Sequence, residues 1–418
     1  MSLALKNFSE ENNNIPYVEE IINIGDFLLE KNPNDKKIIE DAKVACNIYW
    51  IKNLEELNFA NKKIIVVIPA LTWTQKIFAN TPSQWDWWAN TYWKKWNILD
   101  PNKSIVIWLN YFWSLFNDNK EKHKLNFYPV PPEKQVEAWK KALEKLWLKK
   151  IDILFWGSNW WGHIHHWVLD KNKKLNPEIL IPIAWPIAPS KKAKEFFKIQ
   201  LDFLEENDSL ENISSRLEKN LENLKWKSEL FDELVKLTKN EILNYNKKED
   251  ENSKKIMKIV RQIWFLKFVW PKFFDRFWFD KEWIKLKNFE EARKNMMNYF
   301  EKEWVKFEKR FGKSYLKILL KWIVEAHKFS PKEYVRKISK EINLIIIWLK
   351  DDTLFEEENL KNYFEEVKNL REKNNHSWKT IFESISWENS EKAAHDYFLW
   401  EEWWQIISDK IKQILNWI

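Results

Sequence analysis

The chain has 418 residues, of which 45% are hydrophobic and 31% charged, so it is long enough and apolar enough to bury a large core. Its 69 basic and 62 acidic residues give a net charge of +7, and their even spread speaks against a nucleic-acid partner. No apolar run of about 18 residues and no signal-peptide pattern occur, so we expect a cytoplasmic protein that is not inserted in a membrane.

Strand and helix patterns alternate along the first part of the chain. Lys63–Ile68 is a continuous β-branched run, which is typical of a strand buried on both faces of a parallel sheet, and Ser104–Leu109 repeats this pattern. Further strands are predicted at 21–29, 43–50, 151–155 and 178–184, and a helix at 135–146. The single cysteine, Cys46, lies in an apolar stretch and is expected in the core. The alternation predicts a parallel α/β sheet.

The pattern changes after Pro189. From Lys191 to about Lys328 the chain is highly charged, and residues 201–237 and 289–329 have the periodicity of amphipathic helices. A buried strand returns at 341–349, and an amphipathic helix is predicted at 403–415. The simplest architecture is a sheet core interrupted by a helical lid. We therefore divide the chain into a first core segment, a lid and a second core segment (1–190, 191–335 and 336–418).

The glycine and tryptophan contents are unusual. The chain has 4 glycines and 30 tryptophans, whereas glycine makes up about 7% of an ordinary chain. Several tryptophans stand where a turn or a left-handed backbone favours glycine. We hypothesise that many of them stand for glycine, as would follow if a UGA codon that means glycine in the source organism were translated as tryptophan. The alternative is a truly tryptophan-rich protein. The positions where glycine is expected are Trp73, Trp147, Trp156, Trp160 and Trp161.

One segment has the pattern of a catalytic serine turn. Residues 151–162 read IDILFWGSNWWG, which becomes a buried strand, G-G-S-N-G and a helix when Trp156 and Trp160 are read as glycine. A sharp strand-to-helix turn of this kind exposes the hydroxyl of a nucleophilic serine, here Ser158. The helix N-terminus would supply backbone N–H groups for a developing oxyanion. As printed, the motif lacks both glycines, and the alternative is a serine that only caps a helix.

A nucleophilic serine needs a base and an acid that orients the base. Asp352 follows the predicted strand 341–349, with Asp351 as its rival, and His395 follows a further helical stretch. Serine, acid and histidine then come in an order that is known for such triads. No metal site is predicted, because the three histidines just after the serine do not share one helix face (His163, His165 and His166).

Taken in order, these motifs resemble those of the homoserine O-acetyltransferase family, acyltransferases with the α/β-hydrolase fold. The match covers residues 20–190 and 290–400, and Asp352 is preferred over Asp351 because DTLF resembles the family's D-x-L-F-P. Trp167 falls where the family has a tryptophan, so we expect it to be genuine. The other matching segments are 69–73 (PALTW, resembling H-A-L-T-G), 87–96 (resembling G-W-W-D-x-L-V-G-P-G-K), 156–161 (resembling G-G-S-M-G-G), 299–316 (resembling Y-L…F…R-F-D-A-N-x-Y-L) and 395–399 (HDYFL, resembling G-H-D-A-F-L).

The resemblance implies an α/β-hydrolase fold, with a mostly parallel central sheet and an inserted helical lid. It also implies acyl transfer through an acyl-Ser158 intermediate, with His395 as base and Asp352 as its acid. The oxyanion would be held by two backbone N–H groups, those of Leu71 and Asn159. The substrate-binding residues that it implies are Arg310, Tyr315 and Asp396.

The resemblance further implies the reaction partners. The acceptor would be the hydroxyl of homoserine or a related amino alcohol, as in methionine and other amino-acid biosynthesis. Acetyl-CoA or succinyl-CoA would be the co-substrate, no cofactor would stay bound, and two copies would form a homodimer through the lid. The sequence departs from the family at Pro69 in place of histidine, at Gly312 in place of aspartate, and after Gln200, where the arginine is missing. The alternatives are a serine esterase, with water as the acceptor, and a catalytically inactive binding module.

Overall fold

The computed structural model describes most of the predicted strands and helices, and the statements below concern these residues alone. They are residues 16–28, 38–59, 61–68, 102–110, 132–156, 167, 175–182, 191–222, 228–245, 253–268, 272–279, 284–310, 316–317, 320, 324, 342–349, 357–373, 379–385 and 409–413. Among them, no helix is both long and apolar enough to cross a membrane.

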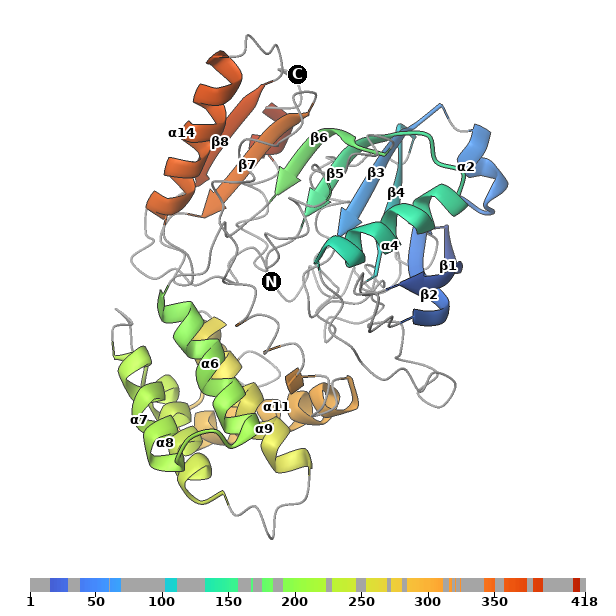
Figure 1. Cartoon of the computed structure of the whole chain (residues 1–418). Coiled ribbons are helices and arrows are strands. Elements are labelled where there is room, and N and C mark those ends of the chain that lie inside the picture. The colour runs from blue at the N-terminus through green and yellow to red at the C-terminus, as the bar shows by residue number, and fades with distance from the viewer. Residues whose placement is uncertain are drawn as a thin grey trace.

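The described strands form one sheet of eight strands (Figure 1). The first three in this sheet, β1, β2 and β4, pair antiparallel, and all the later neighbours pair parallel. The predicted mostly parallel sheet is therefore confirmed. In spatial order the strands are β1 (Tyr17–Leu28), β2 (Ile38–Tyr49), β4 (Ser104–Leu109), β3 (Lys63–Ile68), β5 (Ile151–Trp156), β6 (Pro177–Pro182), β7 (Asn343–Leu349) and β8 (Thr380–Ile385).

The central strands consist mainly of apolar residues and are almost entirely buried. All six residues of β4 are buried, as are the last five of β3, as is typical of central strands that are covered on both faces. β1 and β2 each begin earlier than predicted, because the first four residues of each strand are exposed or half-buried and lack a buried apolar pattern. Gly25 interrupts the β1–β2 register with a φ of 77°, a conformation that suits glycine at a bulge.

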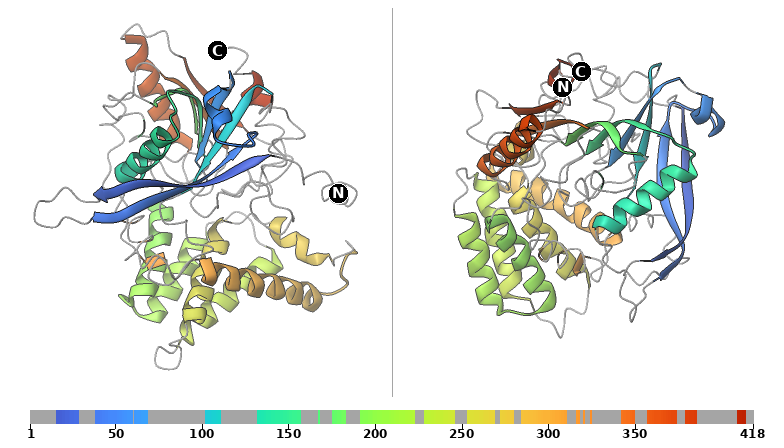
Figure 2. Two further views of the ribbon diagram at one scale, coloured as in Figure 1. Left: turned by 90° about the vertical axis from the view of Figure 1, so that its right-hand side faces the viewer. Right: turned by 45° about the horizontal axis from the view of Figure 1, so that its top comes forward.

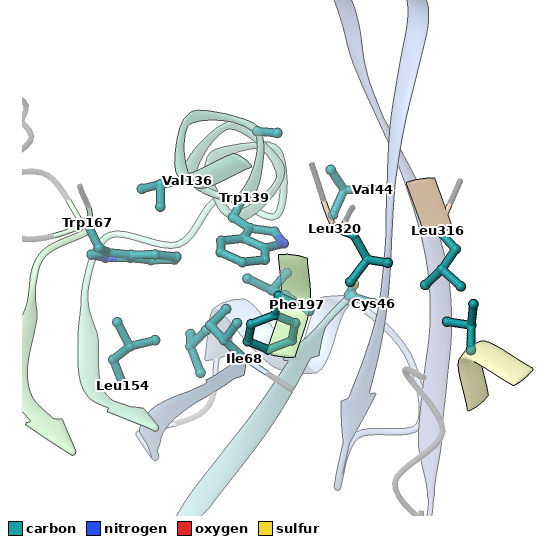
Figure 3. Close-up of a cluster of buried hydrophobic side chains, with 14 of the residues drawn as sticks. Val44, Cys46, Ile68, Val136, Trp139, Leu154, Trp167, Phe197, Leu316 and Leu320 are labelled. Atoms are coloured by element: carbon teal, nitrogen blue, oxygen red, sulfur yellow. The ribbon is translucent and has the colours of Figure 1, made fainter. Parts of the chain in front are cut away.

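A cluster of buried side chains joins the sheet to its helices. Figure 3 shows Phe197 of α6 (Lys191–Glu205) in the same group as Ile68 of β3 and Trp139 of α4 (Pro132–Lys145). Cys46 of β2 belongs to this group, fully buried as predicted, and burial raises the pKa of its thiol. Because Phe197 is part of the cluster, α6 connects the helices after β6 to the core of the sheet.

The helices between β6 and β7 gather on one side of the molecule, below the sheet in Figure 1 and in both views of Figure 2. The region 201–237, which the sequence pattern makes helical throughout, contains parts of three helices. Serine side chains start two of them, because Ser209 Oγ accepts the N–H of Asn212 and Ser228 Oγ that of Phe231. The long helices here are α6, α7 (Leu210–Leu221), α8 (Glu229–Leu243), α9 (Ser253–Phe268) and α11 (Phe289–Arg310), while α14 (Glu357–Lys373) lies beside β8.

One arginine ties the first two helices of this group together. The guanidinium of Arg216 on α7 binds Glu195 and Asp202 of α6 at 2.7 and 2.8 Å, and Asp208 of the connection at 2.8 Å. The hydrogen bond from Asn212, more than that from Arg216, lowers the pKa of Asp208. The ion pair between Arg216 and Asp208 is therefore weakened when the carboxyl group of Asp208 is protonated.

We expect Arg216→Met to lower the free energy of unfolding by about 1–2 kcal/mol at pH 7, since it removes hydrogen bonds to charged but partly solvated groups. The lowered pKa means that the contribution of Asp208 is full above the pKa of its unfolded form, about 3.9, and is lost as pH falls through the folded value. The difference from wild type in thermal unfolding should therefore shrink at pH 3. An equal difference at pH 7 and pH 3 would contradict the ion-pair origin.

Candidate functional site

Three of the predicted site residues follow strands that end at one edge of the sheet. β5 ends at Trp156, just before Ser158, β3 ends at Ile68, just before Leu71, and β7 ends at Leu349, just before Asp352. β3, β5, β6 and β7 pair in parallel, so their C-terminal ends share this edge. Ligand and catalytic sites of open α/β sheets lie at this edge.

Apart from the backbone of Arg310, the predicted site residues lie outside the residues that the structure describes. For Arg310 the backbone is described, as the last residue of α11, but not the side chain. The structure therefore shows which elements lead to the candidate site and how those elements are held, and it gives no distance within the predicted triad. The other residues that lie outside the described ranges are Ser158, Asp352, His395, Leu71, Asn159, Tyr315 and Asp396, together with the rival Asp351 and the three histidines after the serine.

A strand that the sequence pattern did not predict precedes the candidate base in the chain. β8 pairs in parallel with β7 from Leu344–Thr380 to Leu349–Ile385, and His395 is the next histidine along the chain. Its sequence, TIFESI, mixes polar and apolar residues, as suits the last strand of the sheet, and lacks the continuous apolar run of the central strands. The alternation of Ile381 and Glu383 was too weak a signal to identify a strand.

Two buried polar side chains hold β7 and β8 together at their N-terminal ends, which lie at the edge of the sheet opposite to the candidate site. Arg371 of α14 donates to the carbonyl oxygens of Ile342 (2.7 Å) and Lys379 (3.1 Å), just before the two strands. Asn343 Oδ1 accepts the N–H of Lys379 at 2.9 Å. Both side chains are less than one-tenth exposed. They fix how far each strand extends toward the C-terminal edge of the sheet, at which β7 ends just before Asp352 in the chain.

A third buried polar side chain, Asp152, joins β3 to β5. Asp152 Oδ2 accepts the backbone N–H of Ile64 at 2.6 Å, and Asp152 Oδ1 accepts from Lys150 Nζ at the same distance. Asp152 lies in a strand that is predicted to be buried, and its local sequence indicates no role for it, because its partner lies 88 residues away in the chain.

Two of the tryptophans have the contacts of genuine tryptophan. The indole N–H of Trp139 donates to the carbonyl of Asn110 at 2.7 Å, and that of Trp167 to the carbonyl of Leu175 at 3.1 Å. Both rings are fully buried, and their centroids lie 6.2 Å apart. Glycine at either position would leave a large cavity and remove the donor of a buried hydrogen bond. These contacts support the expectation that Trp167 is genuine and extend it to Trp139.

Trp147 has the opposite environment. Its φ is 60°, the left-handed conformation that the sequence predicted at this helix end, and its side chain is 77% exposed. Its N–H donates to Glu144 O at 2.9 Å and that of Leu148 to Leu143 O at 3.2 Å, the hydrogen-bond pattern of a Schellman motif. Glycine is the usual residue at this position of the motif.

Two further tryptophans refine the glycine hypothesis. Trp50, directly after β2, has a φ of 74°. Trp156 is the last residue of β5, pairs with Ile68 and Pro182, and is not among the residues with positive φ. A left-handed backbone therefore favours glycine at Trp50 and Trp147, whereas at Trp156 the reason for glycine would be side-chain bulk.

Comparison with solved structures finds proteins of similar fold over nearly the whole chain. The homoserine O-acetyltransferase from Staphylococcus aureus is 15% identical, with 94% of this chain and 95% of that chain covered and a TM-score of 0.54. The homoserine O-acetyltransferase from Bacillus anthracis is 12% identical (94% and 97% covered, TM-score 0.57), and esterase E22 is 11% identical (94% and 100% covered, TM-score 0.59).

No protein-family model and no curated protein sequence matches this chain. The structural likeness nevertheless extends over nearly the full length of each chain, and it agrees with the mostly parallel sheet and the helices inserted between β6 and β7. The chain therefore has the α/β-hydrolase fold.

Proposed function

We propose that the protein is an O-acyltransferase that moves an acyl group from acetyl-CoA or succinyl-CoA to the hydroxyl of homoserine or a related amino alcohol. The observation that carries this proposal is the arrangement of β3, β5 and β7. The motifs of Leu71, Ser158 and Asp352 each follow a parallel strand at one edge of an α/β-hydrolase sheet. Structures of two homoserine O-acetyltransferases share this fold.

The proposed reaction has two halves with one base. His395 takes the proton of the Ser158 hydroxyl as its oxygen attacks the thioester carbonyl, and Asp352 stabilises the imidazolium. The backbone N–H groups of Leu71 and Asn159 hold the oxyanion, the carbon–sulfur bond breaks, and CoA leaves with the proton. In the second half His395 deprotonates the acceptor hydroxyl, whose oxygen attacks the acyl-serine carbonyl. The bond between the acyl carbon and Ser158 Oγ breaks, the ester product forms, and the imidazolium returns its proton to Ser158.

Acceptor recognition is assigned to three residues of the resemblance. Arg310 and Asp396 carry charges opposite to those of an amino acid's carboxylate and ammonium, and Tyr315 offers a hydroxyl. Neither substrate is a bound cofactor, and the proposal includes no metal, nucleic acid or membrane partner. We also propose that two copies associate through the lid.

Ester hydrolysis is the second candidate reaction, and the residue at one sequence position favours it. Gln200 of α6 is fully buried, and Leu201 stands where the resemblance leads one to expect an arginine. A missing guanidinium would weaken recognition of an amino acid's carboxylate. Esterase E22 and the acetyl esterase MekB share the fold, with TM-scores of 0.59 and 0.54. In that reaction water would take the place of the acceptor hydroxyl.

Thiol release distinguishes the candidates. The enzyme, with glycine restored at positions 73, 147, 156, 160 and 161, is incubated with acetyl-CoA or succinyl-CoA, with and without homoserine. We expect free thiol to form at least ten times faster with the acceptor, because without it the acyl-serine is removed only by slow hydrolysis. Equal rates of thiol release with and without acceptor would favour the esterase. If neither donor releases thiol and p-nitrophenyl acetate is not cleaved, the result would favour the binding module.

A further inference from the structure

A buried carboxylate lies at the start of the strand that leads to the proposed nucleophile. Asp152 is the second residue of β5 and is 6% exposed. Its Oδ2 accepts the N–H of Ile64, the second residue of β3, at 2.6 Å, which is short for a hydrogen bond from a backbone nitrogen. One side chain therefore connects the beginnings of two neighbouring parallel strands.

This hydrogen bond lies directly before the ladder between the two strands. The Cα pairs run from Ile65–Ile153 to Ile68–Trp156, so the carboxylate takes the place of a strand carbonyl one residue ahead of the first pair. A buried backbone N–H needs an acceptor, and the carboxylate satisfies that of Ile64. The contact thus defines where β5 begins relative to β3.

The second oxygen of the carboxylate is also bonded. Lys150 Nζ lies 2.6 Å from Asp152 Oδ1, and this hydrogen bond raises the pKa of Lys150. The side chain of Lys150 is 63% exposed, so its ammonium keeps contact with water. A buried carboxylate is costly unless it is paired and hydrogen-bonded. Asp152 has both kinds of partner, so each of its carboxylate oxygens accepts a hydrogen bond.

We propose that Asp152 is a positioning residue for acyl transfer, because it sets the axial register of the strand before Ser158 against the strand before Leu71. This inference rests on the proposed function, in which Ser158 attacks the carbonyl and Leu71 binds the oxyanion. Ser158 comes soon after Trp156, and Leu71 soon after Ile68, the last pair of the same ladder. An axial shift at one end of two short, rigid strands therefore reaches the other end.

Catalysis requires accurate placement of the reacting groups, so the hydrogen bond from Ile64 to Asp152 should affect the rate. A misplacement of about 1 Å can cost about 10²-fold in rate, and one residue of register corresponds to about 3.3 Å. Asp152→Leu removes both acceptors and should lower kcat by about 10- to 100-fold, with KM for the acyl donor changed less than threefold. Asp152→Asn keeps one acceptor oxygen for the N–H of Ile64, so it should retain most of the activity.

The test compares these variants with a control of similar stability, in the glycine-restored full chain. Val44→Ala is the control, because Val44 is fully buried in β2, which leads to no proposed site residue. We measure thermal unfolding, kcat, KM and the rate of labelling by a fluorophosphonate. Asp152→Leu should lose kcat and labelling rate, whereas Val44→Ala should lower the melting temperature alone. A kcat for Asp152→Leu within threefold of that of Val44→Ala would overturn the proposal.

Three further outcomes are distinguishable. If Asp152→Leu does not fold, Asp152→Ser takes its place, since its hydroxyl is too short to reach Ile64, and the same limits on kcat apply relative to Asp152→Asn. If the unsubstituted enzyme is not labelled, or Ser158→Ala is labelled equally well, the proposed function itself is wrong, and the positioning role is overturned with it. An enzyme that is labelled at Ser158 and insensitive to position 152 overturns the positioning role alone.

Discussion

Ser158→Ala should abolish acyl transfer, with kcat at least about 10⁴-fold lower, while the melting temperature stays within a few degrees of the parent enzyme. The substitution removes only the oxygen that attacks the thioester, and loss of a catalytic serine typically costs several orders of magnitude. The measurements are steady-state thiol release in the glycine-restored enzyme, labelling by a fluorophosphonate, and thermal unfolding.

The matched control is Ser104→Ala. Ser104 begins β4, is buried, and lies at the end of the sheet away from the candidate site, so its loss should leave kcat within about threefold. Activity of Ser158→Ala within tenfold of the parent enzyme would remove Ser158 from the mechanism. Loss of activity together with loss of the folded state would instead assign Ser158 a structural role.

Restoring glycine should convert an unstable chain into a folded enzyme. A non-glycine residue in the left-handed region, as at Trp147, costs about 1–2 kcal/mol, and overpacking by a few methylenes costs about 1–3 kcal/mol. Several such costs together exceed the usual stability of a domain, about 5–15 kcal/mol. The chain as printed should therefore give insoluble or inactive protein, whereas glycine at 73, 147, 156, 160 and 161 should give a cooperative unfolding transition and activity.

Single substitutions separate the two kinds of tryptophan. Trp147→Gly should raise the free energy of unfolding by about 1 kcal/mol, because it relieves the left-handed φ of an exposed residue. Trp139→Gly and Trp167→Gly should lower it by about 3–5 kcal/mol or more, because each leaves a cavity in the core. Reading the coding DNA is an independent check: UGA is expected at 147, 156 and 160, and UGG at 139 and 167. UGG at 156 and 160, or native peptides with tryptophan there, would refute the glycine hypothesis.

The central strands could be predicted from local sequence because their environment is uniform. β3 and β4 are buried along nearly their whole length, and a continuous β-branched run meets that demand without reference to any other segment. The helix end at Trp147 was predictable for a similar reason, since a left-handed cap is a local requirement of the backbone. The order of the serine, aspartate and histidine motifs was likewise readable from the chain.

Other features depended on partners that are far away in the sequence. β8 is a strand because β7 pairs with it, and its mixed residues reflect a place at the end of the sheet. The sequence pattern marks Trp147 as a helix-end position but gives no sign of the role of Trp139, whose burial and indole hydrogen bond identify a core tryptophan. Asp152 looks like an ordinary polar residue until the fold brings its carboxylate to the N–H of Ile64. Local patterns therefore predicted the central strands and suggested the candidate triad of this protein, whereas long-range contacts decided that β8 is a strand and which side chains hold the strands in register.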